Sequence, residues 1–496
     1  MRRNSLALHE GKSTDAGTNG IDLSLDPIGH SWLPPAVTEV VRRLAPLTLA
    51  AAAWISLSPY FVWGSVQWTF YASVVTALVA AACWATGARL RWRSSEALGL
   101  ILVSLFLIYI TLEPRLDGGH TRWIYVLPTL VALTLLSTAQ RQRCLYAFAA
   151  IFAVSLVPGI VDSLWLAAGL PQTFGETPVP NAAMAAHGVR FLTSPGALFI
   201  ESNSTMLPWG GVLFRLSAIY DEPGTVGTNA ALLMIALRVR ISDWRVPILY
   251  LAGVLSFSLA FAVLATFGLV GYAVIRRQAL LLIAILPILA GASMALGSLQ
   301  ISAPIGTRSH IVVNGPSPAP STSTTQASPQ PTQPPRTFTP DGPGLRPTQR
   351  IDDRSLAPMN ALFAQYEHSG LKTLLLGIAS DASVVRGGDS QVWTRVLTDH
   401  GILGFVLLFG GVALLGLQAW RRSGSTQSGL LFLALYALNI YQRPVVWLPY
   451  ALLLLICGPA AASISGRALG SIRVWLNTQH IWEQRKARSD EVGLSA

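Results

Sequence analysis

The sequence predicts an all-α fold: a polytopic integral membrane protein with about 12 transmembrane helices and two large external loops. Two observations support this class. Of the 496 residues, 52% are hydrophobic and only 12% are charged, and the mean hydropathy is +0.49. An ordinary soluble domain carries more charge than this. In addition, apolar runs long enough, or nearly long enough, to cross a membrane as helices recur along the chain.

These apolar runs give the order of the expected helices. The clear ones lie at about 45–63, 67–87, 97–113, 123–138, 145–168, 226–237, 278–296, 396–420, 428–441 and 445–463. The remaining run, 246–275, is either one long helix or two short helices separated at Ser256-Phe257-Ser258.

The arginines decide between these two alternatives. Counting two helices in 246–275 gives twelve spans and places 14 arginines in short cytoplasmic loops but only 3 in short outer loops. Counting one helix would move Arg276 and Arg422, among others, to the outside. The positive-inside rule therefore favours twelve spans with both termini in the cytoplasm. The net charge of +11 reflects this orientation, and nucleic acid is not expected as a partner.

Two long external segments interrupt the helices. The expected segments are a cytoplasmic tail (1–41), helices 1–5 (42–168), a first external loop (169–225), helices 6–9 (226–296), a second external loop (297–395), helices 10–12 (396–463) and a cytoplasmic tail (464–496). In the second external loop, ten of the 32 residues from Pro316 to Pro347 are proline, which predicts an extended, disordered tether. Arg354 to Gly377 follows, with Leu362 and Tyr366 at near-helical spacing, which predicts an amphipathic helix on the outer membrane surface.

One polar cluster precedes a mid-chain helix. RLSAIYDEPGTVGTNAALLMIAL begins at Arg215 and passes through Asp221 and Glu222 to Pro223 before it becomes apolar. Acidic residues followed by proline are typical of a helix start. Arg215 would then simply form an ion pair with Asp221 or Glu222. The alternative is that these groups bind or transform a substrate.

A second polar cluster lies in GGDSQVWTRVLTDHGILGFVLLF, Gly387 to Phe409. If the chain is helical from about Ser390, Arg395 and Asp399 lie on one face, because they are four residues apart. They could form a simple intrahelical ion pair. An ionisable pair at the end of a membrane span is nevertheless a candidate functional site. His400 is either a proton acceptor or a packing residue.

A third polar stretch, Leu112 to Arg122, contains Glu113, Arg115, Asp117 and His120. Its composition resembles a set of metal ligands, but the spacing fits no metal motif, and a solvated turn is the preferred interpretation. The cysteines offer no disulfide or metal pattern either. No metal or other cofactor is expected.

Arginines dominate the charge of the two external loops. An arginine fork binds phosphate oxygens in a bidentate manner and keeps its charge while doing so. Several forks together would suit a diphosphate headgroup at the membrane surface. The candidates are Arg190, Arg215, Arg350, Arg354, Arg386 and Arg395.

Three stretches together resemble the bacterial O-antigen polymerase and O-antigen ligase-like family. RLSAIYDEPGTVG is similar to the family's arginine and acid-proline-glycine element. The segment from Asp353 to Ser380 is similar to its external-loop helix, with Arg354 at the usual arginine. DSQVWTRVLTDHGILGF is similar to the element that enters a span through Gly401 to Gly404. The resemblance covers roughly residues 190–420.

One departure from the family pattern bears on the reaction. Many members, and ligases especially, carry a His-Asn pair where this chain has Ser390-Gln391, preceded by Asp389. This start of the element is more similar to the polymerases. The Pro-rich segment is also not part of the shared pattern.

The resemblance implies a polysaccharide polymerase in the bacterial cytoplasmic (inner) membrane. Its reaction would move a growing glycan from a polyprenyl diphosphate to a sugar hydroxyl on the next lipid-linked unit. Arg215 and Arg395, with Arg354 or Arg190, would hold the diphosphate. The proton acceptor would be Glu222 or, as second choice, Asp389. Secondary candidates are Asp221 and His400.

The implied partners are the lipid-linked oligosaccharide, membrane lipid, a chain-length regulator and a flippase. Two alternatives stay open at this point. One is a ligase-like transfer of the glycan to another acceptor. The other is a secondary transporter, which predicts ionisable residues near the middle of the membrane and an internal repeat. The sequence shows no such repeat.

Overall fold

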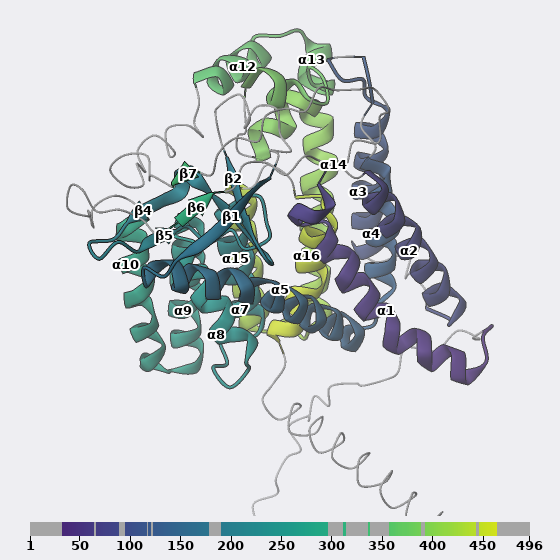
Figure 1. Cartoon of the computed structure of the whole chain (residues 1–496). Coiled ribbons are helices and arrows are strands. Elements are labelled where there is room, and N and C mark those ends of the chain that lie inside the picture. The colour runs from purple at the N-terminus through teal and green to yellow at the C-terminus, as the bar shows by residue number, and fades with distance from the viewer. Residues whose placement is uncertain are drawn as a thin grey trace, which may run out of the picture.

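The computed structural model describes residues 32–63, 66–88, 95–116, 118–120, 123–177, 190–295, 311–313, 336–337, 357–387, 392–442 and 446–463. Most of these residues belong to a bundle of helices, and a small β-sheet lies at the side of the bundle (Figure 1). The helices are α1 (Pro35–Ile55), α2 (Val66–Ala85), α3 (Ser95–Leu112), α4 (Leu127–Leu135), α5 (Thr138–Ala167), α7 (Pro223–Ala236), α8 (Arg245–Leu255), α9 (Leu259–Arg276), α10 (Ile285–Ala295), α12 (Ala357–Glu367), α13 (Leu371–Leu376), α14 (Val392–Arg422), α15 (Gln427–Gln442) and α16 (Pro449–Ala462).

The helices support the assignment to membrane proteins. In the described part of the chain, α2, α3, α5, α9 and α14 are each long and apolar enough to cross a membrane. The ambiguous run at 246–275 forms two helices, since α8 ends at Leu255 and α9 begins at Leu259. Several other apolar helices are shorter, so the count of twelve spans stays a prediction.

The all-α prediction was incomplete, because the segment predicted as the first external loop forms strands. They are β1 (Gln172–Thr177), β2 (Phe191–Ser194), β3 (Ala197–Ile200), β4 (Ser204–Met206) and β5 (Val212–Phe214). Two short strands from the segment predicted as the second external loop extend the sheet in the order β3-β2-β1-β6-β7. They are β6 (Ile311–Val313) and β7 (Arg336–Thr337), and β4 and β5 form a separate pair.

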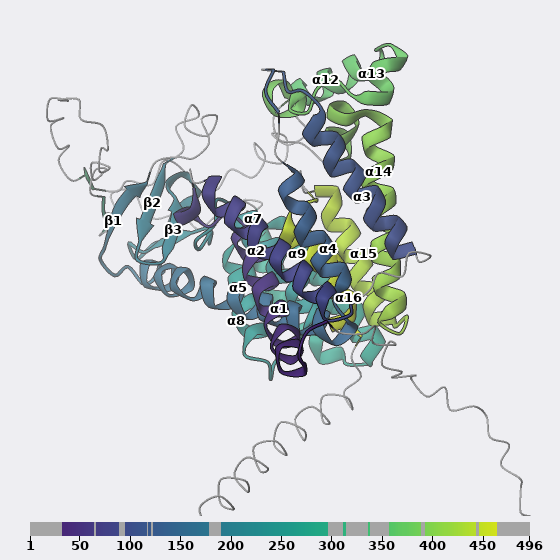
Figure 2. The ribbon, with the colours of Figure 1, turned by 90° about the vertical axis from the view of Figure 1, so that its right-hand side faces the viewer.

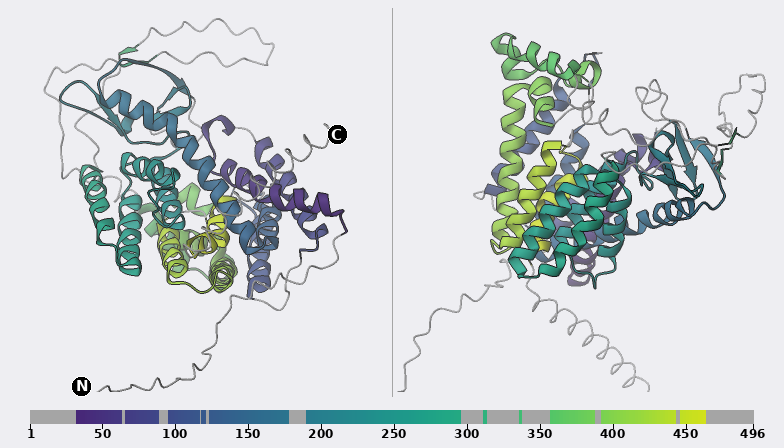
Figure 3. Two further views of the ribbon diagram at one scale, coloured as in Figure 1. Left: turned by 90° about the horizontal axis from the view of Figure 1, so that it is seen from below. Right: turned by 90° about the vertical axis from the view of Figure 1, so that its left-hand side faces the viewer.

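The sheet has a small core of its own. Phe174, Phe199 and Phe214 are buried together with Leu192 and Leu166. Aromatic and apolar residues at strand spacing therefore give this loop a buried interior. Leu166 belongs to α5, and Figure 3 shows the sheet at the far end of that helix, outside the bundle.

The expected amphipathic helix is present as two shorter helices, α12 and α13. Leu362 and Tyr366 on α12 are buried, as the spacing predicted. Its position on the membrane surface stays a prediction. Of the Pro-rich segment, only Arg336–Thr337 is described, where the chain forms β7; the predicted tether otherwise lies outside the described residues.

The bundle has two distinct ends. Helices α3 and α14 lie side by side in opposite directions, and both reach the end that carries α12 and α13 (Figure 2). We call this the α13 end. We call the opposite end the arginine end, where α3 begins, α14 finishes and the loop from α7 to α8 lies. The positive-inside prediction makes the α13 end external.

Candidate functional site

The first turns of α14 carry the predicted ion pair. Arg395 Nε lies 3.6 Å from Asp399 Oδ2, and both side chains are buried or nearly so. Asp399 also accepts two hydrogen bonds from Ser383, at 2.7 Å from the backbone N–H and 2.6 Å from the hydroxyl. These donors stabilise the carboxylate where water is excluded. Arg395 Nε itself is buried and makes no hydrogen bond in the described part of the chain.

Two glycines allow α13 to approach α14 closely at this pair. Gly401 has φ 64° and ψ −170°, which interrupts the helical geometry of α14. A Cβ atom on Gly377, at the end of α13, would lie 2.1 Å from the carbonyl oxygen of Asp399. Only glycine avoids that clash. A Cβ atom on Gly401, the first glycine of the G-x-x-G element, would lie 2.4 Å from the carbonyl oxygen of Leu375, so this close approach depends on both glycines.

A second pair joins His400 to the end of α3. His400 Nδ1 lies 2.5 Å from Glu113 Oε2, and His400 is buried. The hydroxyl of Tyr109, one turn earlier, donates to the carbonyl of Leu376. Burial raises the pKa of the Glu113 carboxyl from 4.5 to about 8. A carboxyl with such a pKa can exchange a proton near neutral pH.

In the described part of Leu112 to Arg122 the expected turn is present and largely exposed, with an isolated bridge between Pro114 and His120. The turn also contacts the segment that follows α13. Arg115 Nε lies 3.1 Å from Asp381 Oδ2, and the backbone N–H of Leu116 donates to Asp381 Oδ1 over 2.8 Å. Asp117 lies outside the described residues. Within the described ranges, no group of His, Cys, Asp and Glu side chains is arranged to hold a metal.

Glu113, Arg115, Asp381, Ser383, Arg395, Asp399 and His400 form one group, which we call the α13-end cluster. Five of its members come from two stretches that are far apart in the sequence, Leu112 to Arg122 and Gly387 to Phe409. Asp381 and Ser383 were not singled out in the sequence. They could have been found from their position directly after the segment that resembles the family's external-loop helix.

Arg215 lies in a different cluster. Its Nε and Nη2 donate hydrogen bonds, each 3.2 Å long, to the carbonyls of Ser256 and Phe257. These are the residues between α8 and α9, where the helical ladder leaves carbonyl groups without partners. Arg215 thus connects the end of β5 to the break between two helices.

The segment after Arg215 is held against α1. The carbonyl of Ile219 accepts from the backbone N–H of Tyr60 over 2.8 Å, and the Tyr220 hydroxyl accepts from Trp54 Nε1 over 2.9 Å. Pro223 begins α7, as predicted, and Glu222 occupies the N-cap position without a side-chain cap bond. Asp221 and Glu222 are half-buried at this helix start.

The other predicted site residues do not join the α13-end cluster in the described structure. Arg190 precedes β2, lies 3.9 Å from Glu176 and is 53% exposed. Arg354 and Asp389 lie outside the described residues. The structure therefore brings Arg395 and His400 together but places Arg215 and Arg190 with other partners.

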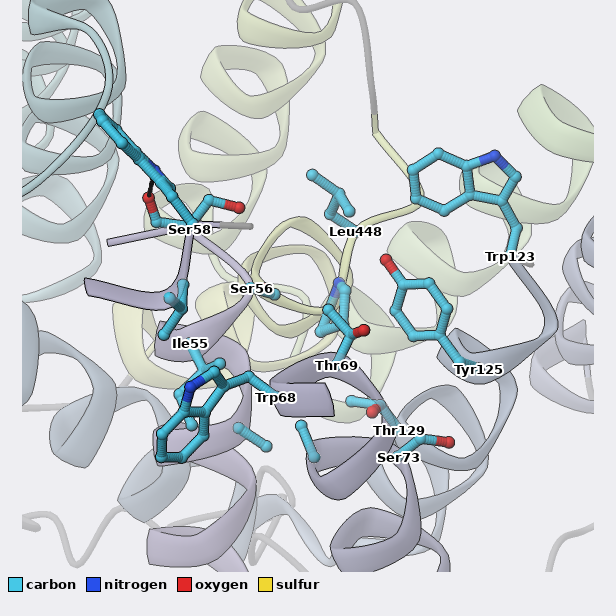
Figure 4. Close-up of a pocket in the computed structure, with 15 residues that line it drawn as sticks. Ile55, Ser56, Ser58, Trp68, Thr69, Ser73, Trp123, Tyr125, Thr129 and Leu448 are labelled. Carbon is cyan, nitrogen blue, oxygen red and sulfur yellow. Dashed lines mark hydrogen bonds between the residues drawn. The ribbon is translucent and has the colours of Figure 1, made fainter. Parts of the chain in front are cut away.

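A pocket of about 470 Å³ opens between the ends of α1, α2, α4 and α16. Figure 4 shows Trp68 and Trp123 at opposite edges of this pocket, with Thr69 and Tyr125 between them. Its lining combines aromatic rings with hydroxyl groups and contains no charged side chain. Such a lining suits a neutral molecule that has both apolar faces and hydroxyl groups.

A series of ring contacts connects the pocket to the α13-end cluster. Trp123, which lines the pocket, contacts the buried Trp447 at a ring distance of 5.8 Å. Phe106 contacts Trp447 at 5.3 Å and His400 at 5.7 Å. Two buried rings thus separate the pocket from the His400–Glu113 pair.

No family model, no curated protein and no solved structure matches this chain. The geometry of the described residues is therefore what bears on function.

Proposed function

We propose that the protein is a polysaccharide polymerase, which transfers a growing glycan from a polyprenyl diphosphate to a sugar hydroxyl of the next lipid-linked repeat unit. The observation that carries the proposal is the α13-end cluster. In this cluster the Arg395 guanidinium is nearly buried, and its Nε makes no hydrogen bond in the described chain. The same helix carries His400, which is hydrogen-bonded to Glu113. Transfer from a diphosphate needs both kinds of group.

The reaction breaks the bond between the anomeric carbon and a phosphate oxygen, and the electron pair leaves with the diphosphate. The acceptor oxygen forms the new bond to the anomeric carbon and loses its proton. Arg395 would stabilise the negative charge that develops on the diphosphate. Because Asp399 has Ser383 as a further donor, it can stay ionised while Arg395 turns part of its fork to phosphate.

The proton acceptor that the geometry favours is Glu113, paired with His400. A carboxyl with a raised pKa accepts a proton more effectively near neutral pH than one at its ordinary value. Glu222 and Asp389 remain the sequence-based candidates. The uncharged pocket beside Trp123 would take a neutral sugar ring of one of the two substrates.

The test is complementation of a gene-deletion strain. With Arg395→Ala, we expect at least a 100-fold loss of long glycan, at the scale of losing one transition-state stabiliser. Lipid-linked repeat units should accumulate. Arg395→Lys should restore polymer only in part, because it keeps the charge but not the fork. The control is Arg43→Ala, since Arg43 is 61% exposed at the arginine end.

Three outcomes would contradict the proposal. Loss of all attached glycan, with none left as a single repeat, would indicate a ligase. Normal glycan with altered uptake of a small solute would indicate a transporter. Finally, wild-type glycan length in the neutral double variant Arg395→Gln, Asp399→Asn would mean that Arg395 serves only to pair Asp399.

A further inference from the structure

The arginine end contains a group of arginines that the proposed reaction does not use. Arg238 and Arg240 follow α7, and Arg276 is the last residue of α9. The two helices pack against each other, and the Tyr272 hydroxyl on α9 donates to the Ile235 carbonyl on α7 over 3.0 Å. This contact lies one turn or less before the arginines, so it brings the two helix ends together.

Buried N–H groups of these arginines have no hydrogen-bond partner in the described chain. They are Nε and Nη1 of Arg238 and Nη2 of Arg276. A buried donor without an acceptor is costly, and more so when it carries charge. The face of Tyr272 supports Arg276, whose guanidinium carbon lies 4.8 Å from the ring centre. That contact orients the guanidinium but accepts none of its hydrogen bonds.

The nearby acid does not balance this charge. Asp243 lies in the same loop, but Arg245 occupies both of its oxygens at 2.8 Å and 2.5 Å. None of Arg238, Arg240 and Arg276 forms an ion pair in the described ranges. Burial, and then the charges of Arg240 and Arg276, lower the pKa of Arg238. The three arginines therefore repel one another.

The backbone also directs Arg238 to this place at a conformational cost. Arg238 has φ 65° and Val239 has φ 50°, a left-handed region that favours glycine. Their N–H groups donate to the carbonyls of Ile235 and Met234 and so close the end of α7. Glycine is usual at the first of these positions. An arginine at this position therefore carries a conformational cost, and it places a guanidinium at the end of α7.

We propose that Arg238, Arg240 and Arg276 form a phosphate-binding site at the arginine end, one that takes the headgroup of an anionic phospholipid or a free phosphate. A phosphate group offers several charged acceptor oxygens, which would satisfy the buried N–H groups and offset the mutual repulsion. Basic pockets between membrane helices on the cytoplasmic side are suited to such headgroups. This site is independent of the proposed polymerase reaction.

The experiment uses the purified full-length protein in neutral detergent. Its melting temperature is measured during titration with phosphatidylglycerol, with inorganic phosphate and with phosphatidylcholine. We expect phosphatidylglycerol to raise the melting temperature of the wild type in a saturable manner and phosphatidylcholine to leave it unchanged. In the double variant Arg238→Gln, Arg276→Gln, the phosphatidylglycerol concentration that gives half of the maximal shift should rise at least tenfold. The matched control is Arg43→Gln, Arg421→Gln, which removes the same charge from exposed positions at the same end.

The results separate the possible ligands. A response to inorganic phosphate as well as to phosphatidylglycerol supports the site and shows that phosphate alone suffices. A response to phosphatidylglycerol only supports the site with a lipid headgroup as its ligand. No response of the wild type, or an equal loss in the control variant, overturns the proposal. If the double variant does not fold, Arg238→Gln and Arg276→Gln are tested singly, and an unchanged half-saturating concentration in both overturns the proposal.

Discussion

The two ends of the bundle differ in how their arginines form ion pairs with carboxylates. At the α13 end, Arg115 contacts Asp381 and Arg395 contacts Asp399. At the arginine end, Asp243 contacts Arg245 and Glu39 contacts Arg43, but Glu96 is shared by Arg141 and Arg422. Arg238, Arg240 and Arg276 at that end form no ion pair in the described chain. In the proposed reaction, Arg395 meets negative charge that develops only in the transition state. An unmatched arginine favours an anion that is always present.

The largest expected effect tests which end is external. In a background without Cys83, Cys144 and Cys457, Gln365→Cys on α12 and Ser242→Cys between α7 and α8 are both exposed. On intact cells, an impermeant thiol reagent should label the first completely and the second not at all. Permeabilised cells, in which both should react, are the control. The reverse pattern would exchange the two ends and overturn the predicted orientation.

The next largest effect concerns Glu96, the carboxylate that contacts both Arg141 and Arg422 at the arginine end. The side chains of Glu96 and Arg141 are only 3% and 2% exposed. Glu96→Gln leaves Arg141 buried without its countercharge, which should cost about 3–5 kcal/mol in the free energy of unfolding. Denaturant titration in detergent micelles measures this. Glu39→Gln, at the exposed pair with Arg43, should show no measurable change. Similar small losses in both variants would mean that Arg141 is stabilised mainly by the Thr134 carbonyl.

A smaller effect tests whether Arg215 positions the α8–α9 break or binds substrate. Arg215→Ala removes its two hydrogen bonds to the break, which should cost about 1.5–3 kcal/mol of unfolding free energy. Amide exchange at residues 255–259 should accelerate. Arg190→Ala, at a loose and half-exposed pair, is the matched control. An unchanged stability together with complete loss of polymer would instead favour the predicted diphosphate role.

The smallest expected effect is the change in polymerisation rate with pH, which depends on Glu113. Its ordinary pKa is 4.5, and burial raises it to about 8, so the carboxyl is protonated below pH 8 and ionised above it. A proton acceptor must be ionised. Polymerisation by purified protein in vesicles should therefore rise about tenfold per pH unit up to about pH 8 and then level off. Glu113→Gln should remove this rise, and Arg43→Ala should keep it. A flat wild-type profile from pH 6 to 9 would assign the proton to another group.

Local features of the molecule were predictable from the sequence, and long-range ones were not. The break between α8 and α9 follows from charge counting and chain geometry, and the start of α7 follows from Pro223. The Arg395–Asp399 pair depends only on helical spacing. In contrast, His400 and Glu113 are 287 residues apart, and no pattern within either stretch indicates the other.

The sheet was missed for a related reason. Hydropathy marks helices that cross a membrane, but strands of two to six residues give a much weaker signal. Phe191 and Phe199 do indicate buried strands once the helices are set aside. The hydrogen bonds from Arg215 to the carbonyls of Ser256 and Phe257 were not foreseen, because backbone carbonyls carry no mark in the sequence.

The pairing of β1 with β6 bears on how the chain is synthesised. Gln172 pairs with Ile311, so the neighbour of β1 on one side leaves the ribosome roughly 140 residues later. At a synthesis rate of about 5–20 residues per second, β1 waits on the order of ten seconds for that neighbour. During this interval α7, α8, α9 and α10 are made, and one edge of β1 stays open. The strands between α5 and α7 are thus open to mispairing throughout the synthesis of the middle of the protein.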